Sequence, residues 1–234
     1  MNDKPVAIAH RGDPISEREN TLAAFQAAVG SGADMVELDL RRTRDGEIIV
    51  VHDPSLARLW GIDRAVVDLD LAAIRDVGSG ALRIPSLGEV LDAIEVPLMI
   101  DFTGEEVVEG AVLAVRSAGA MTRSLFVTGH VEALRRLRAI APEARIGLTW
   151  IAPEPPLPTL LDELRAEFWN PAFNLVTNER VAEMHARGFK VSTWTVDDPR
   201  DMAVVAGAGV DAIVSNQIAG LRSFLADGWV GPGS

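Results

Sequence analysis

Two acidic side chains stand two positions apart within an otherwise apolar stretch of the chain. Glu37 and Asp39 belong to the run at residues 35–40, whose pattern predicts a buried strand. Alternate side chains of a strand point to the same side, so both carboxylates should project together, with Cα atoms roughly 7 Å apart. Burying two unpaired carboxylates would cost free energy or raise a pKa, and a bound cation removes that conflict.

A third carboxylate, Asp101, lies in another predicted strand and could supply a further oxygen ligand from an adjacent position. Three carboxylates without a thiolate suit one hard divalent cation, Mg²⁺ or Ca²⁺. The alternative is a structural ion network in which the first two carboxylates pair with Arg41, Arg42 or Arg44. Charged residues near the carboxyl ends of barrel strands are typical of active sites, which favours the metal.

Two histidines, His10 and His52, each end an apolar run and could reach the same rim as the carboxylates. Histidine suits proton transfer because its ordinary pKa of about 6.5 lets one ring accept a proton while another donates one. Arg11 adds a permanent cation for a phosphate oxygen, although a salt bridge to Glu37 or Asp13 would also explain it. His130 and His185 stand in helical contexts, where solvation or capping is the usual role.

Short apolar runs alternate with helical patterns along the whole chain. The runs that predict strands are residues 6–9, 35–40, 48–51, 98–102, 125–128, 146–150, 191–196 and 212–214. Such alternation implies parallel strands joined by right-handed crossovers, in a closed barrel or an open sheet. No GxGxxG follows the first run, which favours the barrel. We predict an α/β fold, a single TIM (β/α)8 barrel domain over residues 1–234, with a short insertion around residues 59–83.

The composition and net charge of the chain limit the kinds of partner that it can bind. The chain has 234 residues, no cysteine and a formal net charge of −12, which repels polyanions, so we expect no nucleic-acid partner. No apolar stretch approaches the roughly 20 residues of a spanning helix, and no secretory signal is visible at the N-terminus. We therefore expect a cytoplasmic protein without membrane insertion. Homo-oligomerisation is left open.

Many short motifs resemble, in order and spacing, those of glycerophosphodiester phosphodiesterases along nearly the whole chain. They are His10-Arg11-Gly12, Glu19-Asn20-Thr21, Gly32-Ala33-Asp34, Glu37-Leu38-Asp39, Asp45-Gly46, Val50-Val51-His52-Asp53, Pro85-Ser86-Leu87, Trp194-Thr195-Val196 and Gly209-Val210-Asp211. Each motif alone is weak, but together in register they are a strong signal. The phosphatidylinositol phospholipases C and the sphingomyelinases D are similar to this family in fold.

The resemblance implies a TIM barrel that uses a divalent cation to hydrolyse a small-molecule phosphodiester to glycerol 3-phosphate and an alcohol. Carried over by position, the two acid/base histidines are His10 and His52, and the phosphate-contacting arginine is Arg11. The metal-binding carboxylates of the family fall on Glu37 and Asp39.

The chain departs from the family at its usual Glu-x-Lys, which here is Asp101-Phe102-Thr103. Asp101 can still be a metal ligand, as the sphingomyelinases D use an aspartate there. Thr103 can donate one neutral hydrogen bond to substrate but cannot offset phosphate charge, which affects substrate choice and rate. A smaller departure is Ser215-Asn216, where the family usually has Thr-Asp.

Trp194 lies toward the end of its predicted strand and is expected to form an apolar wall for the glycerol or the alcohol, with barrel packing as the alternative. The missing lysine leaves two other functions open. One is a phosphodiesterase of the same fold acting on another lipid headgroup diester, as a lysophospholipase D does. The other is a binding protein that kept the barrel and lost turnover.

Overall fold

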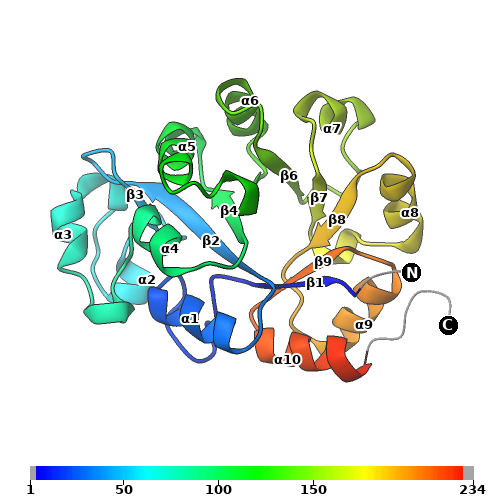
Figure 1. Ribbon diagram of the computed structural model, residues 1–234, viewed down its shortest axis with the longest axis horizontal. Helices are drawn as coiled ribbons and strands as arrows, with labels where there is room; N and C mark the ends of the chain where they lie inside the picture. Colours follow the sequence, from blue (N-terminus) through cyan, green and yellow to red (C-terminus); the bar gives the residue numbers. More distant parts are fainter. Residues whose placement is uncertain (1–3, 229–234) are drawn as a thin grey trace.

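A closed ring of eight parallel strands forms the centre of the computed structural model, which describes residues 4–228 (Figure 1). Its strands are β1 (Val6–Ala9), β2 (Met35–Arg42), β4 (Leu98–Phe102), β5 (Ser124–Thr128), β6 (Arg145–Trp150), β7 (Phe168–Pro171), β8 (Lys190–Thr193) and β9 (Ala212–Ser215). The ring closes because β1 pairs in parallel with both β9 and β2. The predicted α/β TIM barrel is confirmed.

Alternation along the strands separates the inside of the barrel from its outside. The lower interior is filled by a small apolar cluster, comprising Ile8, Met35, Met99, Leu125, Val127, Phe168, Ala212 and Val214. Side chains of the other parity join a larger cluster between the strands and the helices, as Val36, Leu38 and Ile100 do. Glu37 and Asp39 share the inward parity of Met35, so they stand above an apolar floor.

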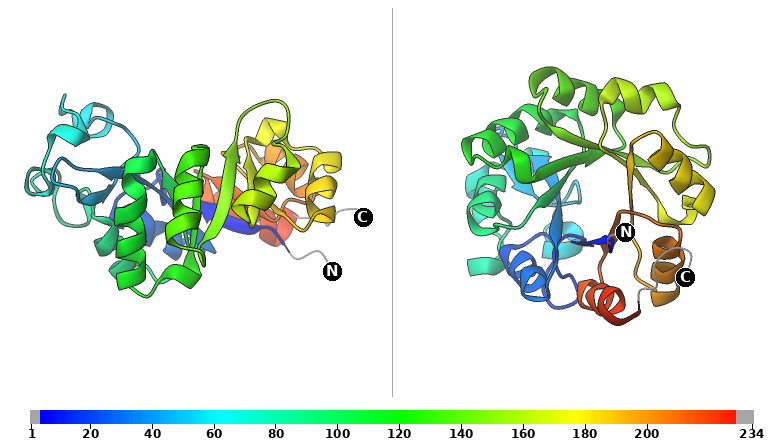
Figure 2. Two further views of the ribbon diagram at one scale, coloured as in Figure 1. Left: turned by 90° about the horizontal axis from the view of Figure 1, so that it is seen from above. Right: turned by 45° about the vertical axis from the view of Figure 1, so that its right-hand side comes forward.

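Helices surround the ring and cover its outer face, as the right-hand view of Figure 2 shows. They are α1 (Leu22–Gly30), α4 (Leu87–Ala93), α5 (Val108–Ser117), α6 (Val131–Ile140), α7 (Pro158–Leu164), α8 (Asn178–Ala186), α9 (Pro199–Gly207) and α10 (Ile218–Ser223). Local signals start several of them: the Thr21 hydroxyl caps α1, and Ser86 with Glu89 forms a capping box on α4. Within the described residues, none of the helices combines the length and apolarity needed to span a bilayer.

An arm extends from one side of the barrel (Figure 1; Figure 2, left view). It comprises β3 (Ile48–Val50), which turns back antiparallel to β2, and residues 51–86, which include α2 (Ala57–Trp60) and α3 (Leu71–Arg75). The arm has an apolar cluster of its own, made by Ile49, Val51, Leu56, Val66, Leu69, Ile74, Val77 and Ile84. The insertion expected around residues 59–83 lies within it.

Two of the strand predictions need correction. The run at residues 48–51 is not a parallel barrel strand, because β3 pairs antiparallel with β2 outside the ring. It resembles a barrel strand because it is buried on both sides, with Ile49 in the arm cluster and Val50 in the main core. The missing barrel strand is β7, whose four residues end in Asn170 and Pro171 and so lack a clear apolar pattern.

Candidate active site

Three carboxylates meet at the carboxyl ends of two neighbouring strands. Asp39 on β2 lies directly opposite Asp101 on β4 in the parallel register, and Glu37 lies one inward position below Asp39. One oxygen from each of the three side chains falls within 4.8 Å of the others. This set, the acidic triad, is therefore arranged so that it could hold a metal ion, as expected from the sequence.

Burial disfavours the ionised forms of Glu37 and Asp101 in the acidic triad. Glu37 and Asp39 are 4% and 3% exposed. Burial raises the pKa of Glu37 well above its ordinary value, and the charge of Asp39 raises it further. Burial and Asp39 together also raise the pKa of Asp101. Buried carboxylates whose pKa values are raised in this way fit a site for a hard divalent cation.

The alternative, in which Glu37 and Asp39 pair with Arg41, Arg42 or Arg44, does not form within the described residues. Within residues 4–228 no ion pair joins the triad to Arg41, Arg42 or Arg44, and Arg44 pairs with Asp70 instead. The ion-pair partner of Asp39 is Arg11, whose Nε lies 3.0 Å from Oδ2 without hydrogen-bond geometry.

Arg11 is fixed at the rim by three acidic groups. Its backbone N–H donates to Glu37 Oε2 at 2.9 Å, and its Nη1 donates to Glu19 at 2.9 Å. Burial alone would lower the pKa of Arg11, but Asp39, Glu37 and Glu19 outweigh burial and raise it. The charge of Arg11 is therefore permanent and its position is held from both ends. Asp13, considered as a partner from the sequence, instead accepts from Ser16.

The loop that carries Arg11 turns sharply. Arg11 has a φ of 57° and Gly12 a φ of 85°. A Cβ on residue 12 would lie 2.6 Å from the backbone carbon of Ala24, so the loop is packed directly on α1. Glycine is thus required at this position by both the backbone conformation and the space.

Asn20 is a site residue that the sequence singles out only as part of the Glu19-Asn20-Thr21 motif. Its Nδ2 donates to Asp39 Oδ2 at 2.7 Å, and its buried backbone adopts a φ of 57°. An asparagine in this left-handed conformation, directly before a helix that Thr21 caps, is the signal that could have singled it out. Asn20 therefore orients a predicted metal ligand.

His10 is oriented by Asn216. The Nδ1 of His10 lies 2.7 Å from Asn216 Oδ1, and Asn216 Nδ2 donates to Asp197 at 2.8 Å. Because the amide nitrogen is engaged with a carboxylate, Oδ1 is the acceptor and the proton lies on His10 Nδ1. The Nε2 is left with its lone pair, 4.0 Å from Glu37 Oε2. Burial, followed by Arg11, lowers the pKa of His10, which favours the neutral ring.

His52 reaches the rim from the arm. It follows β3, which runs back toward the barrel beside β2, and its Nδ1 lies 2.8 Å from Asp53 Oδ1. Arg58 on α2 binds both oxygens of Asp53, at 2.6 and 3.0 Å, and also donates to Glu19. The Arg58 hydrogen bonds, and then the one from His52, lower the pKa of Asp53 to about 2. A carboxylate that stays ionised therefore backs this imidazole.

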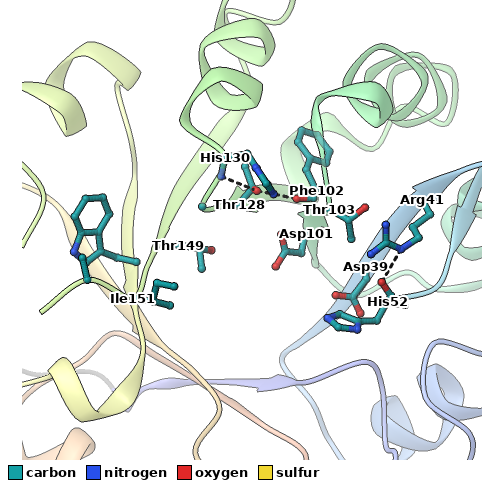
Figure 3. A pocket seen from close by; sticks show the side chains of 13 residues that line it. Asp39, Arg41, His52, Asp101, Phe102, Thr103, Thr128, His130, Thr149 and Ile151 are labelled. Carbon is teal, nitrogen blue, oxygen red and sulfur yellow. Dashed lines mark hydrogen bonds between the residues drawn. The ribbon is translucent and has the colours of Figure 1, made fainter. Parts of the chain in front are cut away.

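Two connected spaces lie above the apolar floor. The inner cavity, about 160 Å³, is lined by both histidines, the acidic triad, Arg11, Asn170 and Trp194. The outer hollow, about 520 Å³, shares Asp39, Asp101 and His52 with it, as Figure 3 shows, and continues toward Thr103, His130, Trp150 and Ile151. The two histidines predicted for proton transfer thus line one cavity with the predicted ligands.

The remaining predicted residues lie as follows. Trp194 lines the inner cavity, and its Nε1 donates to the Asn170 carbonyl at 3.0 Å. Thr103 lines the outer hollow, but its hydroxyl donates to the Leu40 carbonyl, so only its oxygen lone pair is available. His185 lies away from these spaces and bonds to Asp211. The substrate contacts of Trp194 and Thr103 stay predictions.

Comparison with known proteins settles the family. The model of the "Glycerophosphoryl diester phosphodiesterase family" matches residues 10–219 of the 234. The chain belongs to this family. The match spans the barrel strands β2 and β4 to β9 and leaves out only β1. It also includes every residue of the acidic triad and both histidines.

Individual relatives of this glycerophosphoryl diester phosphodiesterase family member agree. A "Glycerophosphodiester phosphodiesterase" of Caldanaerobacter subterraneus is 30% identical over 232 residues, 91% of this chain and 94% of the relative. The crystal structure of a "Putative glycerophosphoryl diester phosphodiesterase" from Silicibacter pomeroyi superposes with a TM-score of 0.88 at 27% identity, over 97% of this chain and 95% of that one. A "Lysophospholipase D GDPD1" of Rattus norvegicus is 39% identical over 110 residues, 40% of this chain and 35% of the relative.

Proposed function

We propose that this protein hydrolyses glycerophosphodiesters to glycerol 3-phosphate and an alcohol, with one divalent cation and two histidines. The observation that carries the proposal is the meeting of the acidic triad with His10 and His52 around one cavity, in a chain of this family. A site of this kind suits a phosphodiester because its charges match an anionic phosphate and its imidazoles can move protons at both ends of the reaction.

Glu37, Asp39 and Asp101 would hold the cation, Mg²⁺ or Ca²⁺. When bound, the cation supplies charge for a nonbridging phosphate oxygen and lowers the pKa of a water or hydroxyl that it contacts. Arg11, which lies beside Asp39 in the same cavity, would take another share of the phosphate charge. Trp194 supplies an apolar wall for the carbon skeleton of the substrate.

The two imidazoles receive different roles. His10 holds its proton on Nδ1 through Asn216, so its Nε2 lone pair faces the cavity and accepts the proton of the attacking hydroxyl or water. His52 is held by the Asp53 carboxylate through Nδ1, so its Nε2 can be directed at the leaving alkoxide and give it a proton. His52 is also half-exposed, so solvent can restore its proton after each turnover.

The test is the release of glycerol 3-phosphate from glycerophosphocholine with Mg²⁺, with Ca²⁺ and with a chelator, for the wild type, His10→Ala and His52→Ala. We expect release that the chelator abolishes and that each variant lowers on the order of 10²- to 10⁴-fold. A substrate whose leaving alcohol is already a good leaving group should rescue His52→Ala but not His10→Ala. Release by both variants at the wild-type rate would contradict the proposal.

A second candidate function is cleavage of lysophospholipid headgroups. The partial similarity to a lysophospholipase D favours it, together with the exposed apolar side chains Ile151 and Leu157, 73% and 74% exposed, on the loop beside the outer hollow. An acyl chain could lie on such a rim. Equal or faster cleavage of lysophosphatidylcholine than of glycerophosphocholine would establish this function. Tight binding of both diesters without product release would instead identify a binding protein.

A further inference from the structure

Arg41 places a positive charge beside the acidic triad without a carboxylate partner. It follows Glu37 and Asp39 at the same parity on β2, so its side chain leaves the strand on the inward side. Its Nε donates to the His52 carbonyl at 2.7 Å, and this is its one side-chain hydrogen bond in the described part of the chain. Over the same residues it forms no ion pair, whereas Arg11, Arg44 and Arg58 each do.

The guanidinium of Arg41 lies beside Thr103, the residue that replaces the lysine of the family. Leu40 pairs with Phe102 in the β2–β4 register, so Arg41 and Thr103 are the next neighbours along the two strands. Both line the outer hollow with Asp39 and Asp101, and Figure 3 shows the guanidinium turned toward these groups. Thr103 offers no charge and gives its hydroxyl proton to Leu40. The cation at this level of the barrel therefore comes from β2.

The free Nη groups of Arg41 match the oxygens of a phosphate. A guanidinium is planar and permanently charged, and it binds phosphate oxygens through two parallel N–H groups. Arg11 occupies the Oδ2 side of Asp39, where it is bound to Glu19 as well. Arg41 lines the outer hollow, whereas Arg11 lines the inner cavity, and Asp39 and Asp101 border both spaces. Two arginines thus flank the place where a phosphate would meet the triad.

We propose that Arg41 binds a nonbridging oxygen of the scissile phosphate and provides the charge that Thr103 lacks. This inference rests on the proposed function and assigns a second phosphate-binding arginine to the same site. Arg41 also holds the His52 carbonyl, so a substitution could act through the position of His52 alone. The variants must separate the charge of Arg41 from its Nε–H donor.

Arg41→Lys keeps the charge and loses the guanidinium geometry, whereas Arg41→Gln loses the charge and keeps an N–H donor that can reach the His52 carbonyl. We expect kcat/KM for diesters to fall on the order of 10- to 100-fold in Arg41→Gln and clearly less in Arg41→Lys. Adding Thr103→Lys to Arg41→Gln should restore much of the loss, because an ammonium from β4 enters the same space. Arg42→Gln, on the same strand but exposed, is the matched control and should keep wild-type activity.

The following results would contradict phosphate binding by Arg41. If Arg41→Lys is as poor as Arg41→Gln and Thr103→Lys gives no rescue, Arg41 only positions His52. If the loss appears only with diesters whose leaving alcohol is anionic, Arg41 binds the leaving group instead. Calorimetric binding of glycerol 3-phosphate in Mg²⁺ tests the same contact without turnover, and Arg41→Gln should weaken it on the order of 10-fold. A wild type that cleaves no diester would refute the proposed function, while unchanged binding in Arg41→Gln would refute this inference.

Discussion

Asp39 and Asp101 lie directly opposite each other on neighbouring parallel strands, and both face the inside of the barrel. Two carboxylates in such register repel each other unless a proton or a cation stands between them. The protein therefore carries a local charge repulsion that a bound cation would relieve. Several measurable properties depend on that relation.

The metal-free protein should lose stability as the pH rises. The folded pKa values of Glu37 and Asp101 lie above their ordinary values of 4.5 and 3.8, so folding holds these protons more tightly than the unfolded chain does. Their contribution is most favourable below the ordinary pKa values and is lost as the pH rises toward the raised ones. Saturating Mg²⁺ should remove this loss. Unfolding temperatures with chelator and with Mg²⁺ should diverge from pH 5 to pH 8, and parallel curves would contradict the expectation.

Asp101→Asn should separate stability from activity. The neutral amide removes the repulsion with Asp39, so the metal-free variant should be more stable than the wild type by about 1 kcal/mol at neutral pH. The same change removes a predicted ligand, and we expect diester hydrolysis to fall on the order of 10³-fold. Denaturant unfolding and activity assays measure the two effects. Asp92→Asn, at an exposed position, is the control and should change neither.

Asn20→Gly should weaken metal binding without disturbing the backbone. Glycine accepts the positive φ of residue 20, so the chief loss is the hydrogen bond from Nδ2 to Asp39. Loss of a group that orients a metal ligand commonly weakens metal affinity by about 10- to 100-fold. Isothermal titration with Mg²⁺ measures this directly. Unchanged affinity would mean that Asp39 needs no support from Asn20.

Arg58→Gln should loosen the support of His52 and lower kcat on the order of 10-fold, with little change in KM. The pKa of Asp53 is lowered to about 2, so its contribution to stability is present above its ordinary value of 3.8 and is lost as the pH falls toward 2. The variant should accordingly be less stable by ~0.5–1 kcal/mol at pH 7, as befits a partly exposed pair, and equal to the wild type near pH 2. Denaturant unfolding at the two pH values checks the sign. Arg44→Gln, which breaks the exposed pair with Asp70, should leave kcat unchanged.

Gly12→Ala should be far more damaging than Gly188→Ala. Both glycines have a φ of 85°, but a Cβ at residue 12 would meet the backbone of Ala24 at 2.6 Å, and one at residue 188 would meet nothing within 4 Å. The strained φ alone costs about 1 kcal/mol, which is the loss expected for Gly188→Ala. Gly12→Ala should lose several-fold more and also displace Arg11. Thermal unfolding compares the two, and equal losses would show that the loop can move away from α1.

The parity and the location of the triad could be predicted because they follow from local sequence. Glu37 and Asp39 interrupt an apolar run at a spacing of two, and that spacing fixes their side of the strand. Asp101 needed only the assumption of an adjacent strand. The barrel followed from the alternation of runs and helical patterns, since parallel neighbours require such crossovers.

The sequence pattern could not distinguish β3 from a barrel strand, because burial on both faces erases the alternation that marks an exposed hairpin. β7 was missed because four residues ending in Asn170 and Pro171 carry too little apolar pattern. The supporting groups Asn20, Asn216 and Arg58 were also not assigned roles. Each acts through a contact with a residue at least five positions away, and only the folded chain determines such contacts.

The origin of His52 has an evolutionary consequence. Its partner His10 belongs to the barrel wall, but His52 belongs to the arm, whose apolar residues pack mainly with one another. Mutations within the arm could therefore remove the proton donation proposed for His52 while the proposed binding of the ion and the phosphate is retained. A descendant could then change from an enzyme to a binding protein through few mutations, with the barrel unchanged.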